Sequence, residues 1–233
     1  MLVSMHQPSY FPWLGLIDKI KKSELYICMD EVQLADRAYQ HRNIFLDSNG
    51  EVKTLTININ KKNYRQKYIK DLELSSDDWQ KKHSSFFLNN YKRHEYFEEI
   101  YPLIKFIYEK NYKYLIDVLL ESMFAIFEIL KINIDVKLQS SLVYDRELKK
   151  NDLIIGLLNS VSAKKYLSGT GAADYQIESE FVKQEIELIY NSFSHPIYHQ
   201  NSSAFVEGLS SLDMLFNIGI EESKKTIFRE ILV

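Results

Sequence analysis

The first 30 residues constrain the fold of this chain more than any other stretch. They begin with a short apolar run at Leu2–Met5, and a second apolar run follows at Ser23–Met29. Between the two, apolar residues recur at helical spacing from Leu14 onward, and Pro12 stands where the first turn of a helix accepts proline. Strand, helix and strand in this order predict a βαβ unit, whose two strands run parallel.

Polar residues follow both of these predicted strands. His6 and Gln7 come directly after the first strand, and Asp30 comes after the second. The carboxyl ends of neighbouring parallel strands meet at one edge of a sheet, and ligands of α/β folds bind at that edge. We therefore expect His6 and Asp30 to lie at the same edge, together with the other polar residues of a site.

The rest of the chain continues an α/β pattern. Two strand-like segments flank Asn49-Gly50, a strong turn signal, and predict a β-hairpin. Residues 77–131 have helical periodicity, and Pro102 is expected to start one of these helices. Near the carboxyl terminus, Ser210 or Ser211 is expected to cap a helix that Gly219 ends. Further strands are predicted at Ile134–Leu138, Lys165–Leu167 and Ile186–Tyr190.

These elements predict an α/β fold with a mainly parallel sheet. We expect a βαβ start, a β-hairpin and a helical block, at residues 77–131, that covers one face of the sheet. With 233 residues and no visible linker, the whole chain from 1 to 233 is expected to form a single domain with this helical insertion.

Composition narrows the functional classes. The apolar fraction of 45% supports a sizeable core, and the net charge of −3 argues against broad nucleic-acid binding. The one cysteine, Cys28, excludes an internal disulfide and is typical of a reducing compartment. No apolar run is long enough for a membrane helix, and the start lacks the basic leader of a signal peptide. We therefore expect a cytoplasmic protein without membrane insertion.

His6 is the candidate for acid–base chemistry. At the end of a buried strand, a histidine serves either as a structural hydrogen-bonding group or as a general base. A carboxylate beside it, such as that of Asp30, would orient the ring and raise its basicity. A nucleophilic role for Cys28 is not expected, because this thiol lies within a predicted buried strand. Metal binding is not expected either, because the sequence has no cysteine pair, no His-x-x-x-His pair and no Asp-rich loop.

Three stretches are candidates for binding an anion. Arg42 precedes a predicted strand and is either a surface residue or a ligand for phosphate or carboxylate. The turn Ser168-Gly169-Thr170-Gly171 lies between a predicted strand and helix, where glycines allow close backbone approach. It matches neither the Walker loop nor the dinucleotide fingerprint. Residues 61–70 carry five cations and form either a solvated loop or a flexible phosphate clamp.

Several blocks together resemble the WbqC-like family, in the family's order and across essentially the whole chain. They are His6-Gln-Pro-Ser-Tyr-Phe-Pro-Trp-Leu-Gly15, Asp30-Glu-Val-Gln33, Gln40-His-Arg-Asn43, Trp79 with Lys82-His83, Tyr166-Leu-Ser-Gly-Thr-Gly171 and Ser211-Leu-Asp-Met-Leu-Phe-Asn-Ile-Gly219. The family occurs in bacterial gene clusters for O-antigen (lipopolysaccharide) and other surface polysaccharides. The resemblance implies transfer of glycine or a related acyl group to an amino sugar. The matching polar and glycine positions are His6, Gln7, Asp30, Gln33, Arg42, Asn43, Ser168, Gly169, Gly171 and Asp213, and Tyr10 falls in the first block.

These observations lead to the hypothesis of an N-acyltransferase or aminoacyltransferase that acts on a nucleotide-linked amino sugar. His6 is expected to act as the base, and Asp30 as its orienting partner or as a holder of the sugar amine. Gln7 and Asn43 are expected to donate to the carbonyl oxygen. Diphosphate or donor carboxylate would bind at Arg42 and the 168–171 turn, and further substrate contacts are expected from Tyr10, Gln33 and Thr170.

Two alternatives stay open. One is a binding protein that holds a sugar nucleotide or an acyl carrier for a partner enzyme without chemistry of its own. The other is transfer from an aminoacyl-tRNA, which the acidic balance of the chain disfavours and the cations of residues 61–70 favour. The sequence indicates no cofactor and leaves the acyl donor open.

Overall fold

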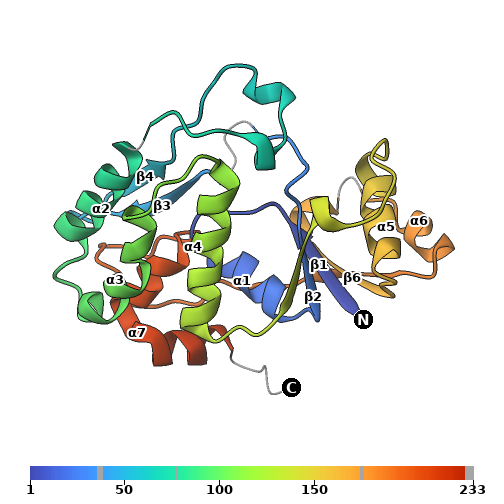
Figure 1. Ribbon diagram of the computed structural model, residues 1–233. Coiled ribbons are helices and arrows are strands. Elements are labelled where there is room, and N and C mark those ends of the chain that lie inside the picture. Colours follow the sequence, from blue (N-terminus) through green and yellow to red (C-terminus); the bar gives the residue numbers. More distant parts are fainter. Residues whose placement is uncertain (36–38, 77, 174–175, 229–233) are drawn as a thin grey trace. The chain divides into compact units, whose positions relative to one another are not determined.

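The computed structural model describes residues 1–35, 39–76, 78–173 and 176–228, and its chain divides into two compact units (Figure 1). Each unit draws on segments that are far apart in the sequence. The expectation of a single domain from 1 to 233 stays a prediction. The first unit consists of Met1–Gln7, Leu16–Glu31 and Asn133–Ser194, and the second of Pro8–Gly15, Val32–Ile132 and His195–Val233.

The first unit contains a five-stranded parallel sheet. Its order is β5-β2-β1-β6-β7, with β1 in the centre, and every neighbouring pair is parallel. This confirms the predicted α/β class and the βαβ start. The order is that of a doubly wound sheet, in which the chain first builds to one side of its central strand and then to the other. The strands are β1 (Leu2–His6), β2 (Leu25–Cys28), β5 (Asp135–Leu138), β6 (Lys165–Gly169) and β7 (Glu187–Asn191).

Helices cover both faces of this sheet. Figure 1 shows α1 (Leu14–Lys21) on one face and both α5 (Lys150–Ser160) and α6 (Glu178–Lys183) on the other. Val3 and Met5 of β1 pack in a buried apolar cluster with residues of α5 and α6. Because side chains alternate along a strand, Ser4 and His6 lie on the opposite face, which is the face of α1. Their polar ends are thereby kept out of that apolar cluster.

The second unit contains the predicted β-hairpin and helical block. That this block covers one face of the parallel sheet stays a prediction. Asn43 and the other residues of β3 pair antiparallel with β4, and Gly50 in the turn has a φ of 79°. The described part of the helical block starts at residue 78, since residue 77 lies outside the described residues. The elements are β3 (Arg42–Leu46), β4 (Val52–Thr56), α2 (Asp78–Asn90), α3 (Phe97–Lys105), α4 (Leu115–Leu130) and α7 (Ser211–Ile227), with short 3-10 turns η1 (Tyr64–Gln66), η2 (Ile69–Asp71) and η3 (Phe106–Tyr108).

One helix start differs from the prediction. Pro102 does not begin a helix but lies inside α3, which begins at Phe97. A proline inside a helix costs a backbone hydrogen bond. Burial compensates for this loss, because Phe97, Ile100 and Ile104 of the same helix are all buried. Phe97 stacks on Phe216 of α7 with the ring centroids 5.6 Å apart, which ties α3 into the aromatic core of the unit.

The predicted cap and break of α7 are confirmed. The hydroxyl oxygen of Ser210 accepts a hydrogen bond from the N–H of Leu212 at 3.3 Å. Gly219 interrupts the helix with φ 71° and ψ 176°, a conformation that residues with a side chain rarely adopt. A Cβ atom at this position would lie 2.5 Å from Cδ1 of Tyr96, so the position also lacks room for a side chain.

We predict that Gly219→Ala lowers the free energy of unfolding by about 2–4 kcal/mol, because backbone strain and the collision with Tyr96 add. Gly208→Ala is the matched control. Gly208 has a φ of 76°, but a Cβ atom there would meet nothing within 4 Å. Gly208→Ala should lower the free energy of unfolding by about 1–2 kcal/mol, through backbone strain alone. Urea unfolding followed by circular dichroism measures both, and equal losses would contradict the steric argument.

Candidate functional site

The carboxyl ends of β1 and β6 form the switch point of the sheet in the first unit. The two strands are neighbours, and their paired residues end with Ser4 opposite Leu167. Beyond this pair, β1 leads toward α1 on one face, whereas β6 leads toward α6 on the other (Figure 1). Ligands of doubly wound sheets bind outside the strand ends at such a point. The structure places the predicted residues His6, Gln7, Ser168, Gly169, Thr170 and Gly171 at or directly after these two strand ends.

His6 is the last residue of β1 and is partly buried. Its Nδ1 lies 2.8 Å from the carbonyl oxygen of Gln7, and a carbonyl only accepts hydrogen bonds. Nδ1 therefore carries the proton of the neutral ring, and Nε2 carries the lone pair. Burial, together with the positive charge of Lys19, lowers the pKa of His6 to about 4. The ring is thus neutral at pH 7, with Nε2 in the form that can accept a proton.

Lys19 is a residue that the sequence analysis missed. It lies on α1 with only 6% of its surface exposed, and its Nζ donates a hydrogen bond to the carbonyl oxygen of Met5 at 2.9 Å. Burial lowers the pKa of Lys19 to about 8. The signal in the sequence is its position between the buried Ile17 and Ile20, but a helical lysine is ordinarily expected in solvent.

The hydrogen bond of Lys19 marks the place where β1 and β6 separate. At the start of the two strands, the N–H of Lys165 donates to the carbonyl of Met1. The carbonyl of Met5, four residues on, points to the same side of β1. A continued ladder would bring the N–H of Gly169 to this carbonyl. The ammonium group of Lys19 donates to this carbonyl instead, which places it beside the switch point.

The glycines of the 168–171 turn are not explained by packing. Gly169 has an ordinary φ of −77°, and a Cβ atom at Gly169 or Gly171 would meet nothing within 4 Å. Alternation along β6 places Gly169 on the face opposite the buried Tyr166, which is the face of His6 and α1. Ser168 is buried, whereas Thr170 is exposed. Open space at the two glycines is what close approach of a ligand to the backbone requires.

Asp30 follows β2 at the same edge, but its carboxylate is bound elsewhere. One oxygen accepts from the N–H of Ser140 at 2.9 Å, and the other accepts from the Ser140 hydroxyl at 2.6 Å. These bonds hold the 3-10 turn η4 (Gln139–Ser141) at the end of β5. The expected pairing of Asp30 with His6 is therefore corrected: the carboxylate binds Ser140 at the end of β5, and the Gln7 carbonyl orients the imidazole. The alternative role of Asp30, holding the sugar amine, stays a prediction.

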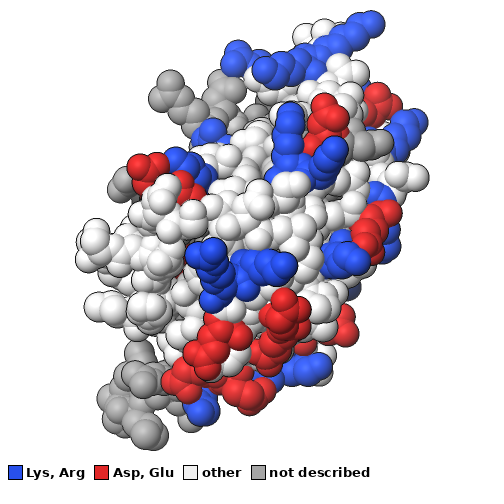
Figure 2. Space-filling view, turned by 90° about the vertical axis from the view of Figure 1, so that its left-hand side faces the viewer, with Lys and Arg blue, Asp and Glu red and all other residues white. Residues whose placement is uncertain are grey.

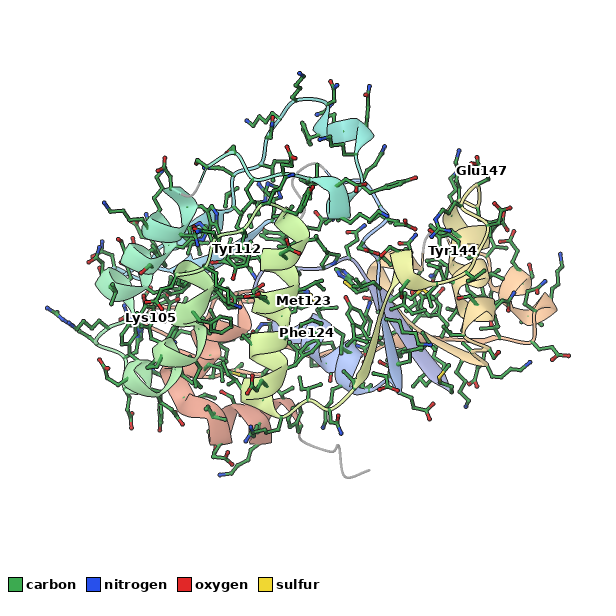
Figure 3. All side chains as sticks on the ribbon, in the orientation of Figure 1. Lys105, Tyr112, Met123, Phe124, Tyr144 and Glu147 are labelled. Carbon is green, nitrogen blue, oxygen red and sulfur yellow. The ribbon has the colours of Figure 1, made fainter. Side chains whose placement is uncertain are left out.

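A second network closes the same β2–β5 end of the sheet. The hydroxyl of Tyr144, on the segment after β5 (Figure 3), donates to the carboxylate of Glu31 at 2.9 Å. Arg146 forms an ion pair with the same carboxylate at 3.3 Å, and Gln139 donates to the Tyr144 hydroxyl at 2.8 Å. The charges of Glu31 and Arg146 thus compensate each other. This distinguishes the β2–β5 end from the switch point, where the described contacts give a buried ammonium group a carbonyl as its partner and no carboxylate.

The remaining predicted residues belong to the second unit. The side-chain amide of Asn43 donates to the carbonyls of Tyr10 and Phe11 at 3.0 and 2.6 Å. The Tyr10 hydroxyl is buried and hydrogen-bonded to Nδ1 of His83 at 3.0 Å. Both side chains therefore hold the segment around Phe11, whose φ is 41°, and the expected donation from Asn43 to a substrate carbonyl is corrected. Phe11 and its neighbours form the Pro-rich turn of the sequence.

Gln33 and Arg42 lie nearer the surface of the second unit. Gln33 is exposed and forms an isolated β-bridge with Tyr68. The guanidinium of Arg42 lies 5.4 Å from the centre of the Tyr39 ring, a cation–π contact. Neither contact tests the predicted role of these residues in binding diphosphate or substrate, and those roles stay predictions.

Asp213 of the second unit is a buried carboxylate held by tyrosines. Its oxygens accept from the hydroxyl groups of Tyr91 at 2.7 Å and Tyr198 at 2.9 Å. Burial raises the pKa of Asp213 to about 6, and the hydrogen bonds from the two tyrosines limit the rise. Tyr91 directly follows α2, and its hydroxyl also accepts from the N–H of Leu46, so the network joins the end of α2 to α7 and the hairpin. Asp213, which lies in the last of the sequence blocks that match the family, therefore has a structural role in the described contacts.

The cationic stretch at residues 61–70 lies in the segment between β4 and α2. Figure 2 shows lysine and arginine side chains at the top of the view, where Figure 1 places this segment. Lys61, Lys62 and Arg65 are exposed, and η1 and η2 provide the only regular backbone in that part of the described chain. The exposed positions fit a solvated loop, and binding of phosphate there stays a prediction.

The described residues contain neither a cluster of side chains that could hold a metal ion nor a helix that could cross a membrane. No group of three or more His, Cys, Asp or Glu side chains gathers closely enough there to hold a metal ion. None of the described helices combines the length and the apolar composition that crossing a membrane requires.

The parallel sheet with its switch point places the first unit in the class of doubly wound α/β structures. The chain belongs to the WbqC-like protein family, whose family model matches residues 7–225. It is also similar to the uncharacterized protein Rv1507c of Mycobacterium tuberculosis. The two are 27% identical over 221 residues, which cover 94% of each chain. No solved structure matches the chain.

We predict that His6 titrates near pH 4 in the folded protein, against about 6.5 in the unfolded chain. The unfolded state therefore binds more protons between these values. The stability that neutral His6 contributes is complete above pH 6.5 and is lost as the pH falls toward 4. Carbon-13 NMR of labelled histidine follows the titration, with His6→Gln to assign the signal. A midpoint near 6.5 would contradict the assigned burial.

Asp30→Asn tests the corrected role of the carboxylate. Because Asp30 binds Ser140 rather than His6, we expect this variant to be less stable by about 1–3 kcal/mol, through loss of a charge-assisted hydrogen bond. The pKa of His6 should stay where it is in the unsubstituted protein. Ser140→Ala is the matched control and should show the same pattern. A changed pKa of His6 in Asp30→Asn but not in Ser140→Ala would instead show that Asp30 interacts directly with His6.

Proposed function

We propose that the protein is an N-acyltransferase that transfers an acyl or aminoacyl group to the amine of a nucleotide-linked amino sugar. The setting, biosynthesis of O-antigen or another surface polysaccharide, rests on the family resemblance of the sequence blocks. The observation that best supports the chemistry is the state of His6. A neutral imidazole, held by the Gln7 carbonyl through Nδ1, keeps the lone pair of Nε2 at the end of the central strand.

The reaction places three demands on the site. The sugar amine attacks the acyl carbon as a neutral nucleophile and forms the C–N bond. Nε2 of His6 then accepts the proton that the nitrogen loses. As the tetrahedral intermediate collapses, the bond to the donor's leaving group breaks and that group departs with the electron pair. Gln7 follows His6 directly and is the proposed donor to the developing oxyanion. Asn43 is not used here, because its amide holds two carbonyls in the second unit.

The low pKa of His6 keeps the ring unprotonated at neutral pH but also makes it a weak base. The ring is protonated only below a pH of about 4, so it is a competent proton acceptor throughout the neutral range. A weak base drives proton transfer less strongly than one with a pKa near 7. The ammonium formed by amine attack is more acidic than the free sugar ammonium, which lessens the demand on the base. The phosphates of a bound sugar nucleotide would further stabilise the protonated ring.

The rival proposal is a binding protein that presents a sugar nucleotide or acyl carrier to another enzyme. A switch point alone fits binding as well as catalysis. The two proposals differ in one measurable respect, which is whether the purified protein by itself forms product. A tRNA-dependent variant of the first proposal draws on the exposed cations Lys61, Lys62 and Arg65.

We predict that the purified protein, given aminosugar nucleotides and a panel of acyl and aminoacyl donors, forms a product with the mass of the acylated sugar. His6→Ala should lower turnover by about 10²–10⁴-fold with the fold intact, as expected for loss of a general base. His199→Ala is the matched control, since His199 is exposed in the second unit and should leave turnover unchanged.

Three outcomes of this assay separate the proposals. Full activity of His6→Ala would remove His6 from the mechanism. Saturable binding of the sugar nucleotide without any change of mass, across the whole donor panel, would favour the binding protein. Loss of activity on ribonuclease treatment of a crude extract would identify an aminoacyl-tRNA as the donor.

A further inference from the structure

Lys19 is a buried cation for which the described residues provide no counter-charge. Its one hydrogen bond in the described structure goes to the carbonyl of Met5, which is a neutral acceptor. Directly after this helix, Lys22 instead pairs with the carboxylate of Asp18 at 2.7 Å. An ammonium group taken out of water is costly unless an opposite charge lies beside it. The lowered pKa of Lys19 expresses that cost, and an anion beside the ammonium would relieve it.

The position of the ammonium group is set by the two strands. It donates to the carbonyl that the N–H of Gly169 would reach if the β1–β6 ladder continued to Met5. It also lies on the same sheet face as His6, since both belong with α1. An ammonium group has three N–H donors, of which the Met5 carbonyl uses one. Two donors are therefore available for a ligand at the switch point.

The open space at the glycines is a second, independent observation. A Cβ atom at Gly169 or Gly171 would meet no atom within 4 Å, and the backbone of Gly169 is in a region open to any residue. Neither conformation nor packing therefore accounts for glycine at position 169. Approach of a ligand to the backbone on the Lys19 side does account for it.

We propose that Lys19 binds the diphosphate of a nucleotide ligand at the carboxyl ends of β1 and β6, with Gly169 and Gly171 leaving room for it. This inference rests on the proposed function, in which the substrate is a nucleotide-linked sugar. It differs from the sequence-based assignment of the diphosphate to Arg42, which stays a separate prediction. A carboxylate offers the same anionic oxygens with half or less of the charge, so it would bind the same donors more weakly.

The structural alternative is that Lys19 only satisfies the Met5 carbonyl. Lys19→Gln separates the two roles, because a glutamine amide can still donate to that carbonyl but carries no charge. Lys21→Gln is the matched control, since it makes the same change at an exposed position of α1. Both variants alter the net charge equally, so any difference in binding between them is local.

The experiment is isothermal titration calorimetry of the full-length protein with uridine diphosphate, inorganic pyrophosphate and acetate. We expect the unsubstituted protein to bind the two phosphate probes and to bind acetate weakly or not at all. Lys19→Gln should bind both phosphate probes about 10–100-fold more weakly, as for loss of a charge-assisted hydrogen bond. Lys21→Gln should bind as the unsubstituted protein does. Preferential binding of acetate would instead assign the site to the donor carboxylate and overturn the diphosphate assignment.

Two further results would also overturn the proposal. One is equal affinity of Lys19→Gln and the unsubstituted protein, and the other is absence of binding by the unsubstituted protein to both phosphate probes. If Lys19→Gln does not fold, NMR of the unsubstituted protein with carbon-13-labelled lysine gives the answer. Pyrophosphate should move the Cε signal of Lys19, assigned with Lys19→Arg, and should leave that of Lys21 in place. An unmoved Lys19 signal at saturating pyrophosphate contradicts the proposal.

Failure of this proposal is distinguishable from failure of the proposed function. The binding experiments involve no acyl donor and no turnover. Phosphate binding that depends on Lys19, without any acylated product, would leave the site in place and remove the acyl transfer. Acyl transfer with unchanged kinetics in Lys19→Gln would keep the proposed function and remove Lys19 from the binding of the diphosphate.

Discussion

The pairing of β1 with neighbours on both sides is the constraint on which the first unit depends. A central parallel strand directs successive carbonyls alternately to the two neighbours, and the ladder to β6 ends after Ser4. From that residue on, the carbonyl of Met5 requires another donor, and Lys19 of α1 provides it. One backbone group at the end of one strand therefore fixes the position of a buried cation. The same alternation places His6 on the side of that cation rather than in the apolar cluster of α5 and α6.

The two ends of the sheet edge differ in how their charges are balanced. At the β2–β5 end, the carboxylate of Asp30 binds Ser140, and that of Glu31 binds Tyr144 and Arg146. These groups are satisfied within the protein, so this end is a stabilising network. At the switch point, the ammonium group of Lys19 meets a carbonyl but no carboxylate among the described residues. An anionic ligand gains more at a site whose charge is uncompensated, which favours the β1–β6 end over its neighbour.

The elements that depend on local sequence could be predicted, whereas those that depend on distant contacts could not. Apolar runs and helical spacing predicted β1, α1 and β2, and Asn49-Gly50 predicted the hairpin, because these signals act over a few residues. The order of the strands could not be predicted, because the chain between β2 and β5 lies in the second unit for about a hundred residues. Asp30 illustrates the same limit: its partner Ser140 is 110 residues away. Lys19 was missed because burial of a lysine depends on a carbonyl of another element.

The central claim is that the nucleotide diphosphate binds where β1 and β6 separate. The most direct measurement is a crystal structure of the protein with bound uridine diphosphate. The account predicts density for the diphosphate at the carboxyl ends of these two strands, within hydrogen-bonding distance of Nζ of Lys19 and beside Gly169. Density for the diphosphate at the Asp30–Ser140 end of the sheet, or among the cations of residues 61–70, with Lys19 still bound only to Met5, would contradict it.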